Sequence, residues 1–386
     1  MQNNIDNFLD ILNQLRFTSR YDDGILSSIC VVNGEIFKLE EVKNMGYDEF
    51  ALRSKKYMPL KLYRYFPDRI CKDFETGKEV NYSIQALESN LVYMQTPTEF
   101  DDVYDSDVNI DFDEYLHIRL LEYAKRCGLV ISCKCTTEEI GQLFINKLWS
   151  FLLSGNIEEI FIKQTDSEME KLSNERFILS VKLELKKTND LVVAVNNALI
   201  EEYNDYVKSL KTIFRTACFA TTPYSQLMWG GAYANNHRGF CIEYTVLPGE
   251  KEYDDIYYNL FPMIYCKTRS DISKRLVISK DKAYDKALLW DIYSNGVLRK
   301  SIDWMFQNEW RLIRPLNKDR GDDYNVKFYP ITKVFLGNRM SRERRSIVID
   351  ICNRKGIPYI GVKRNVFKYE MEPCNVLCEN CKNYLG

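Results

Sequence analysis

The spacing of apolar and polar residues divides the chain into two kinds of region. Near the start, and again over most of the second half, apolar residues recur in short alternating runs bounded by turn residues, which is typical of strands. Between about residues 111 and 215 the spacing becomes three and four residues, with almost no Gly or Pro, which is typical of helices packed together. The sequence therefore predicts an α+β protein with a mixed or antiparallel sheet core and a helical insertion at about 111–215.

The first 57 residues have a pattern of their own. Residues 5–15 repeat apolar side chains at helical spacing, and Asn33-Gly34 stands between two strand-like runs. Asn-Gly suits a tight turn in which both φ angles are positive. We expect a helix and a hairpin in an extension over residues 1–57, followed by an α+β core domain over residues 58–386.

Composition and charge exclude several classes of protein. The chain has 386 residues, of which 45% are hydrophobic and 28% charged, as in an average globular protein. This composition excludes a disordered, collagenous or coiled-coil chain. Its net charge of −2 provides no overall positive field that would draw it onto nucleic acid. Any such contact needs a local basic patch, for which residues 337–345 and 354–365 are the candidates. No apolar run is long enough for a bilayer, and the first residues lack the basic flank of a signal peptide, so we expect a cytoplasmic protein without a membrane partner.

Histidine and cysteine limit the metal chemistry. With two histidines in the chain, a His-rich metal centre is excluded, and we expect no metal in the main site. Most of the 12 cysteines stand alone in apolar runs, as small buried hydrophobes do. Cys374, Cys378 and Cys381 differ, because three thiolates at this spacing can share a zinc ion with a fourth ligand. A free, reduced tail is the alternative, and we favour it.

Common catalytic motifs are absent, including the Walker A loop, GxGxxG, HExxH and GxSxG. The first candidate is therefore a strand, Leu62–Phe66, whose alternation puts Tyr63 and Tyr65 on one face and Arg64 on the other. An arginine inside a strand needs an anion, either a protein carboxylate or a ligand phosphate. The acidic loop at 97–105 is a candidate for pairing with Arg64, for helix capping or for binding a cation.

A second candidate is the dense segment 227–244. Two glycines after Trp229 permit close backbone approach, Trp229 and Tyr233 share a helical face at i and i+4, and His237 follows four residues later. These residues are expected to wall a pocket. In the alternative, the aromatic rings fill the core and His237 bonds only a backbone carbonyl.

A third candidate is Glu309, which is expected to open a strand and to share its face with Arg311. Trp304 and Trp310 flank it, and a carboxylate at a strand end is well placed to stabilise a developing positive charge. A Glu–Arg pair at the surface, which contributes little to stability, is the alternative.

The order of these motifs, with Leu227-Met228-Trp229 followed by a Tyr and H-x-G-x-C, resembles a widespread prokaryotic family of unknown function over about residues 62–372. The Tyr-Arg-Tyr strand and the late Glu-aromatic strand are more distantly similar to the ADP-ribosyltransferase fold, including its DNA-modifying toxin branch. That resemblance implies that Arg64 holds NAD, that Trp229 or Tyr233 stacks on nicotinamide, and that Glu309 stabilises the oxocarbenium. The residues implied to bind the cofactor are Tyr63, Arg64, Trp229, Tyr233 and His237.

Three functions follow as hypotheses. The first is NAD-dependent ADP-ribosyl transfer in a bacterial toxin or anti-phage setting, with nucleic acid or protein as the unknown acceptor; one carboxylate suffices for its cationic sugar. The second is a binding module for a nucleotide-like ligand, with the helical insertion contacting a partner protein. The third is a metal-dependent nuclease, and its carboxylates would be Asp101, Asp102, Asp105 and Glu309. The surroundings of Glu309 discriminate between the first two functions. If Glu309 is salt-bridged to Arg311 and buried away from Arg64 and Trp229, its carboxylate is not available for ADP-ribosyl transfer.

Overall fold

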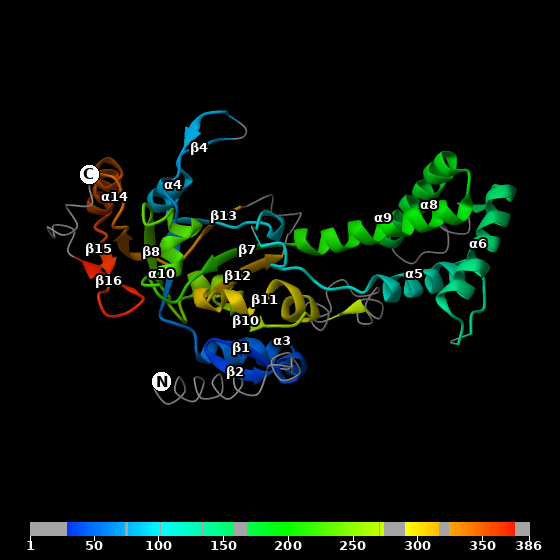
Figure 1. Cartoon of the computed structure of the whole chain (residues 1–386), viewed down its shortest axis with the longest axis horizontal. Coiled ribbons are helices and arrows are strands. Elements are labelled where there is room, and N and C mark those ends of the chain that lie inside the picture. The colour runs from blue at the N-terminus through cyan, green and yellow to red at the C-terminus, as the bar shows by residue number, and fades with distance from the viewer. Residues whose placement is uncertain are drawn as a thin grey trace. The chain divides into compact units, whose positions relative to one another are not determined.

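The computed structural model confirms the α+β class, with helices and mixed sheets (Figure 1). The structure describes residues 29–73, 76–100, 102–132, 134–157, 168–269, 271–273, 290–315 and 324–374. Backbone contacts divide the chain into two compact units: the first comprises 1–107, 212–268 and 296–386, and the second comprises 108–211 and 269–295. In the described ranges no helix combines the length and the apolar character that a membrane crossing requires.

The first unit is built around a five-stranded sheet with the order β16-β15-β14-β8-β3. The strands are β3 (Lys61–Phe66), β8 (Phe240–Thr245), β14 (Ile331–Leu336), β15 (Tyr359–Arg364) and β16 (Met371–Cys374). β14 and β15 are parallel and the other neighbours are antiparallel. A parallel pair needs a crossover, and here it is α14 (Arg342–Lys355), which begins at the N-cap Ser341 and ends at the left-handed Gly356.

The alternation in β3 is confirmed. Leu62 and Phe66 belong to the main hydrophobic core, whereas Tyr63 and Tyr65 belong to a second apolar cluster. The neighbouring strands β8 and β14 divide their side chains between the same two clusters. The sheet is therefore buried on both faces, and the second face is the one that the segment after residue 220 covers.

Two further sheets complete this unit. The antiparallel order β7-β12-β9 comprises β7 (Phe214–Phe219), β12 (Trp310–Pro315) and β9 (Leu260–Pro262). The order β11-β10-β1-β2 comprises β1 (Ile29–Val32), β2 (Glu35–Lys38), β10 (Ile264–Cys266) and β11 (Arg299–Ser301). The expected hairpin is confirmed, because β1 pairs with β2 across Asn33 and Gly34, whose φ angles are 50° and 80°. Since β1 also pairs with β10, the described residues before 57 belong to the first unit. The boundary at 57 stays a prediction, and residues 5–15 lie outside the described residues.

Short elements connect these sheets. They are α3 (Leu39–Lys56), β4 (Cys71–Lys72), β5 (Glu79–Val80), α4 (Tyr82–Ser89), β6 (Leu91–Tyr93), η1 (Pro97–Glu99), α10 (Gln226–Gly230), η2 (Ala232–Ala234), η3 (Lys251–Tyr253), α11 (Asp254–Tyr258), η4 (Tyr293–Val297), η5 (Ile302–Gln307) and β13 (Asn325–Lys327).

In the second unit, the described residues between 108 and 212 form four helices. They are α5 (Phe112–Arg126), α6 (Thr137–Ser154), α8 (Glu168–Thr188) and α9 (Leu191–Thr212). Asp111 caps α5, and Thr136 forms a capping box with Glu139 at the start of α6, so local signals set both helix starts. A core that includes Phe144 and Val181 joins these helices. They lie within the stretch for which the spacing predicts helices.

Candidate functional site

Glu309 stands directly before β12 and is 5% exposed. Its carbonyl oxygen accepts a hydrogen bond from the Met263 amide at 3.0 Å, and its amide donates to the Tyr265 hydroxyl at 2.8 Å. Its side chain meets two cations. Oε1 accepts from Nη2 of Arg311 at 2.7 Å, and Oε2 accepts from Nζ of Lys300 at 3.1 Å. Both carboxylate oxygens therefore have a charged partner.

Asp105 closes a buried network of two acids and two bases. Its Oδ1 accepts from Nη1 of Arg311 at 2.8 Å, and its Oδ2 accepts from Nζ of Lys300 at 2.9 Å. We call Asp105, Lys300, Glu309 and Arg311 the charge network. Burial opposes ionisation of the two acids, but the positive charges of Arg311 and Lys300 outweigh it and lower the pKa of both carboxyl groups. The network is neutral as a whole and fully charged at pH 7.

None of the described residues of the acidic loop pairs with Arg64, so the expectation that this loop pairs with Arg64 is wrong for them. Asp105 pairs with the charge network instead. The loop does supply a cap, because Oε2 of Glu99 accepts from the Thr96 amide at 2.8 Å at the start of η1. Asp101 lies outside the described residues.

Arg64 lies on the main-core face of β3 without a carboxylate partner in the described part of the chain. Its Nη2 donates to the Tyr93 carbonyl oxygen at 3.0 Å, and its buried Nη1 has no hydrogen-bond partner there. The guanidinium lies 5.7 Å from the ring centre of Phe66 and 5.9 Å from that of Phe219. Burial lowers the pKa of Arg64. Rings and one carbonyl replace the anion that the sequence led us to expect.

Trp229 fills the core on the opposite face. It is 0% exposed, its Nε1 donates to the Pro223 carbonyl at 2.7 Å, and its ring meets that of Tyr65 edge-on at 5.3 Å. α10 ends at Gly230, and the next residue, Gly231, has an extended backbone with φ −89° and ψ −165°. The expectation that Trp229 and Tyr233 share a helical face is therefore wrong. The hydroxyl of Tyr233 instead accepts a hydrogen bond from Gln307.

Three successive non-glycine residues then adopt left-handed backbone angles. The φ values of Asn235, Asn236 and His237 are 48°, 53° and 65°. Such residues each cost about 1–3 kcal/mol and persist where the surroundings hold them. Here the His237 amide donates to the Trp229 carbonyl at 2.8 Å, and the His237 carbonyl accepts from the Arg339 amide at 3.0 Å.

The glycines of this motif mark a close backbone crossing. A Cβ at Gly239 would lie 1.9 Å from the carbonyl oxygen of Phe66, and one at Gly337 would lie 2.2 Å from that of His237. Only glycine permits these approaches. Packing therefore explains why glycine stands at the last position of H-x-G and directly after β14.

The His237 ring lies parallel to the Trp229 ring, with centres 6.4 Å apart and 8° between the planes. Its Nδ1 is buried and has no hydrogen-bond partner in the described ranges. Burial and the positive charge of Arg339 lower the pKa of His237, so the ring is neutral at pH 7. His237 does bond a backbone carbonyl, that of Trp229, and it does so through its amide.

A groove of about 440 Å³ opens beside α10. Its lining consists of Thr222, Tyr224, Ser225, Gln226, Leu227, Phe306, Tyr369 and Glu370. Three of these side chains are aromatic, and five carry a hydroxyl or amide group. They come from the segment entering α10, from η5, and from the turn between β15 and β16, whose Met371 amide donates to the Tyr224 carbonyl at 2.9 Å. Sequence patterns gave no sign that these three segments meet.

Sequence reasoning missed a buried carboxylate in β8. Glu243 in β8 is 3% exposed; its Oε1 accepts from Lys61 at 2.8 Å and its Oε2 accepts from the Tyr63 hydroxyl at 3.1 Å. These hydrogen bonds, together with one from Thr332, outweigh burial and lower the pKa of Glu243. Burial and the Glu243 charge in turn raise the pKa of Tyr224, which lines the groove. An acid inside the apolar run GFCIEYTV is the signal that could have pointed to it.

Metal ligands do not gather in the described part of the chain, where no three His, Cys, Asp or Glu side chains are placed to hold an ion. Asp105 and Glu309, named for the nuclease hypothesis, are paired with cations. Cys374 is buried in β16, whereas Cys378 and Cys381 lie outside the described residues. Zinc at these cysteines stays a prediction.

The predicted basic segments are partly neutralised. Arg354 pairs with Glu88 at 3.0 Å, and Lys363 pairs with Glu372 at 3.1 Å. Both pairs are exposed enough for solvent to screen them. The segments therefore carry less free positive charge than their composition indicates.

Fold and site together define an α+β chain with a buried charge network and an open groove lined largely by uncharged groups. Residues 228–312 match a family model described as "Protein of unknown function (DUF2971)". This match confirms the expected resemblance to a family of unknown function over that segment, which includes Trp229 and Glu309 but not Arg64 or Asp105. No curated protein matches the chain, and no solved structure does either. The similarity to ADP-ribosyltransferases stays a prediction.

Proposed function

We propose that the first unit is a binding module whose groove takes a ligand with a flat aromatic ring and hydrogen-bonding edges, such as a nucleobase. The groove itself carries this proposal. Its volume of about 440 Å³ is within the range of about 300–1,000 Å³ that small-ligand sites occupy. Tyr224, Phe306 and Tyr369 offer ring faces for stacking, and every base has a face that stacks.

The polar lining supports the same class of ligand. Thr222, Ser225 and Gln226 bring hydroxyl and amide groups that donate and accept hydrogen bonds. The only charged side chain among the described lining residues is Glu370, whose Oε1 lies 3.6 Å from Nζ of Lys368. A base or nucleoside fits such a lining better than a ligand dominated by phosphates.

ADP-ribosyl transfer remains the rival hypothesis, in a toxin or anti-phage setting. It requires a carboxylate free to face a cationic sugar. The pairing of Glu309 favours the binding module. Arg311 and Lys300 offset the negative charge of its carboxylate, which would therefore stabilise a cationic sugar only weakly. We therefore expect no nicotinamide release from NAD.

Calorimetric titration of the full chain with adenosine, guanosine, cytidine, uridine and NAD tests the proposal. We expect saturable binding of at least one nucleoside, and about tenfold weaker binding by Tyr369→Ala, since one stacked base contributes about 1–3 kcal/mol. Phe367→Ala is the matched control: this ring is 95% exposed in the same turn and does not line the groove.

The same samples, incubated with labelled NAD and protein, RNA and DNA acceptors, test the rival. Absence of nucleoside binding would overturn the binding module. Nicotinamide release that disappears in Glu309→Gln would establish the transferase instead.

A further inference from the structure

One end of the five-stranded sheet brings together arginines from three separate parts of the chain. β14 and β15 are parallel, so both strands run towards this end, and the antiparallel β8 starts from it. Arg364 is the last residue of β15, Arg339 lies three residues beyond the end of β14, and Arg238 lies two residues before the start of β8. The amide of Arg339 donates to the carbonyl of His237 at 3.0 Å, which holds Arg339 beside the residue that precedes Arg238.

The register of the sheet also limits how far apart the arginines of β14 and β15 can be. Leu336 of β14 pairs with Gly361 of β15. Arg339 and Arg364 each follow this pair by three residues, so each Cα lies within about 11 Å of it along its own segment. Since neighbouring strands are about 4.8 Å apart, side chains of this length can reach one extended ligand together.

The charge at this end of the sheet is positive. Arg238, Arg339 and Arg364 are exposed, and none of them has an ion-pair partner in the part of the chain that the structure describes. The acids of the neighbouring β15–β16 turn are paired with lysines instead. Oε1 of Glu370 lies 3.6 Å from Nζ of Lys368, and Oε1 of Glu372 accepts from Nζ of Lys363 at 3.1 Å. A local positive surface therefore exists in a chain whose net charge is −2.

Two exposed aromatic rings follow these arginines in the turn between β15 and β16. Phe367 is 95% exposed and Tyr369 is 97% exposed. Oδ1 of Asn365 accepts from the amides of Phe367 and Lys368, both at 2.8 Å, so side-chain hydrogen bonds hold the backbone of the turn. Because Phe367 and Tyr369 are two residues apart, their Cα atoms lie within about 7 Å of each other. Such rings are suited to stacking on successive bases of one strand.

The same turn connects the arginines to the groove beside α10. Arg364 pairs with Met371 across β15 and β16, and the amide of Met371 donates to the carbonyl of Tyr224 at 2.9 Å. Tyr224 and Tyr369 both line the groove. The arginines, the exposed rings and the groove therefore belong to adjoining segments.

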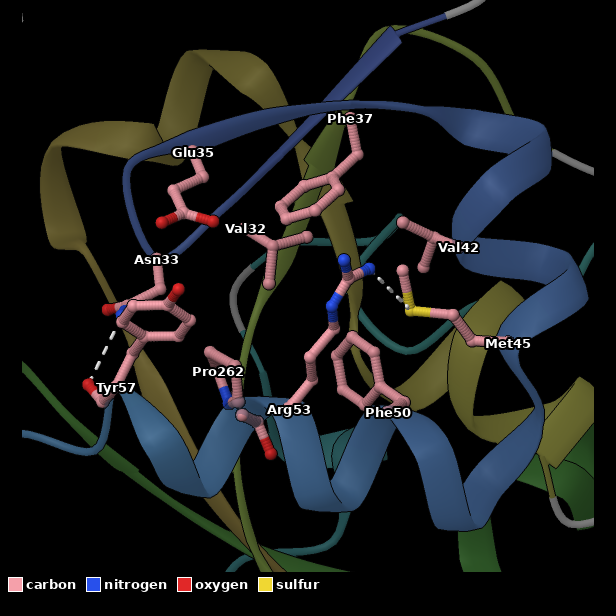
Figure 2. Close-up of a pocket in the computed structure, with 11 residues that line it drawn as sticks. Val32, Asn33, Glu35, Phe37, Val42, Met45, Phe50, Arg53, Tyr57 and Pro262 are labelled. Carbon is pink, nitrogen blue, oxygen red and sulfur yellow. Dashed lines mark hydrogen bonds between the residues drawn. The ribbon is translucent and has the colours of Figure 1, made fainter. Parts of the chain in front are cut away.

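The cavity between the β1–β2 hairpin and α3 is not a rival site for a ligand of this size. Its volume is about 40 Å³, which is room for about one water molecule. Its lining is largely apolar, with residues such as Val32, Val42 and Phe50 (Figure 2).

We propose that this end of the sheet binds single-stranded nucleic acid, an inference that rests on the proposed function because one base of the strand occupies the groove. That base stacks on Tyr369, and the next base stacks on Phe367. Arg364, Arg339 and Arg238 bind phosphates of the strand, since the planar fork of arginine donates two parallel hydrogen bonds to a phosphate.

A single strand uses every feature of this surface, whereas other ligands use fewer. A free nucleoside occupies the groove without reaching the arginines. An acidic peptide offers negative charge but no flat rings of its own backbone for stacking. A duplex keeps the faces of its bases stacked on one another, so it cannot present them to Phe367 and Tyr369.

Fluorescence anisotropy on the full chain tests the proposal, with labelled single strands of about ten nucleotides, one RNA and one DNA of matched sequence. We expect at least one strand to bind about tenfold or more tighter than any nucleoside. The slope of log K against log salt concentration should be about −2, the value for three phosphate contacts to a single strand. The comparison of RNA with DNA identifies the sugar that the surface accepts.

Two variants separate the phosphate contacts from the stacking contact. Arg364→Gln should weaken strand binding and make the salt slope shallower by about 0.7. Phe367→Ala should weaken strand binding by about tenfold and leave the salt slope and nucleoside binding unchanged. Arg354→Gln is the matched control, because Arg354 is an exposed arginine in the last turn of α14, which is at the opposite end of the sheet. Urea unfolding of each variant verifies that it is folded.

The outcomes distinguish this inference from the proposed function. Nucleoside binding without tighter binding of either strand overturns the strand site and leaves the groove as proposed. Equal weakening by Arg354→Gln and Arg364→Gln, or equal affinity for a duplex or for poly-L-glutamate, also overturns the strand site. Strand binding that requires Arg364 and Phe367 in the absence of nucleoside binding supports the strand site and overturns the groove as a site for free nucleosides.

Discussion

The charge network and the groove beside α10 differ in whether their polar groups already have partners. In the network, the charges of Asp105, Lys300, Glu309 and Arg311 are buried, and each is satisfied by an opposite charge. In the groove, hydroxyl, amide and aromatic groups line an open volume of about 440 Å³. The first arrangement joins three segments of the chain, and the second leaves the polar groups for which we propose a ligand. A polar side chain that the protein already pairs is not available to a ligand, whereas one without a protein partner is.

The largest expected effect tests the network. Arg311→Met should lower the free energy of unfolding by about 3–5 kcal/mol, because Asp105 and Glu309 would remain buried around one cation. Arg314→Met, three residues later in β12, removes the exposed pair with Asp255 and should cost less than about 1 kcal/mol. Urea unfolding of both variants measures the difference. Equal losses would show that the network is not the stabilising feature described here.

The next effect concerns the backbone crossing beside the groove segment. Gly239→Ala would place a Cβ 1.9 Å from the Phe66 carbonyl oxygen, and backbone cannot move aside as a side chain does. We expect a loss of about 1–3 kcal/mol or more in the free energy of unfolding. Gly141→Ala is the control, because its Cβ would meet only a Leu120 methyl at 3.6 Å, in ordinary contact. That helical position should be unaffected or slightly stabilised.

Acid should weaken the charge network. The pKa values of Asp105 and Glu309 are lower in the folded protein than in the unfolded chain. Their contribution is therefore complete above the unfolded values of about 4, and it is lost as pH falls through the lower folded values. We expect the free energy of unfolding to fall steadily below about pH 4. Glu309→Gln should show a shallower fall, and an identical slope would contradict this assignment.

The smallest effect on stability is expected in the groove. Tyr369 is 97% exposed, so Tyr369→Ala should change the free energy of unfolding by less than about 0.5 kcal/mol while it weakens nucleoside binding. Thermal unfolding and calorimetry on the same sample separate the two quantities. A large loss of stability would show that Tyr369 contributes to the fold, as the residues of the charge network are expected to do.

Local signals predicted a considerable part of the fold. Asn33-Gly34 marked a hairpin because few residue pairs accept two positive φ angles. The period of two in β3 assigned Tyr63 and Arg64 to opposite faces, and the same period placed Glu309 beside Arg311. Each of these inferences spans only a few residues.

The candidate site was predicted less well, because it depends on meetings between distant segments. Asp105 and Arg311 bind each other across 206 positions of sequence. Phe306 and Tyr369 line one groove from separate elements. No periodicity records such a meeting, so the sequence left the acidic loop at 97–105 as one candidate partner of Arg64 and led us to extend the α10 helix through Tyr233.

The sequence by itself determined the α+β class, the hairpin, the strand faces and the helix caps, since these depend on side-chain period and backbone preference within one segment. Tertiary structure alone decided that Glu309 is paired with two cations and that Arg64 lies against rings. The physical reason is that a charged or hydrogen-bonding side chain pairs with the group that lies nearest to it in space. The nearest group is set by packing, not by position along the chain.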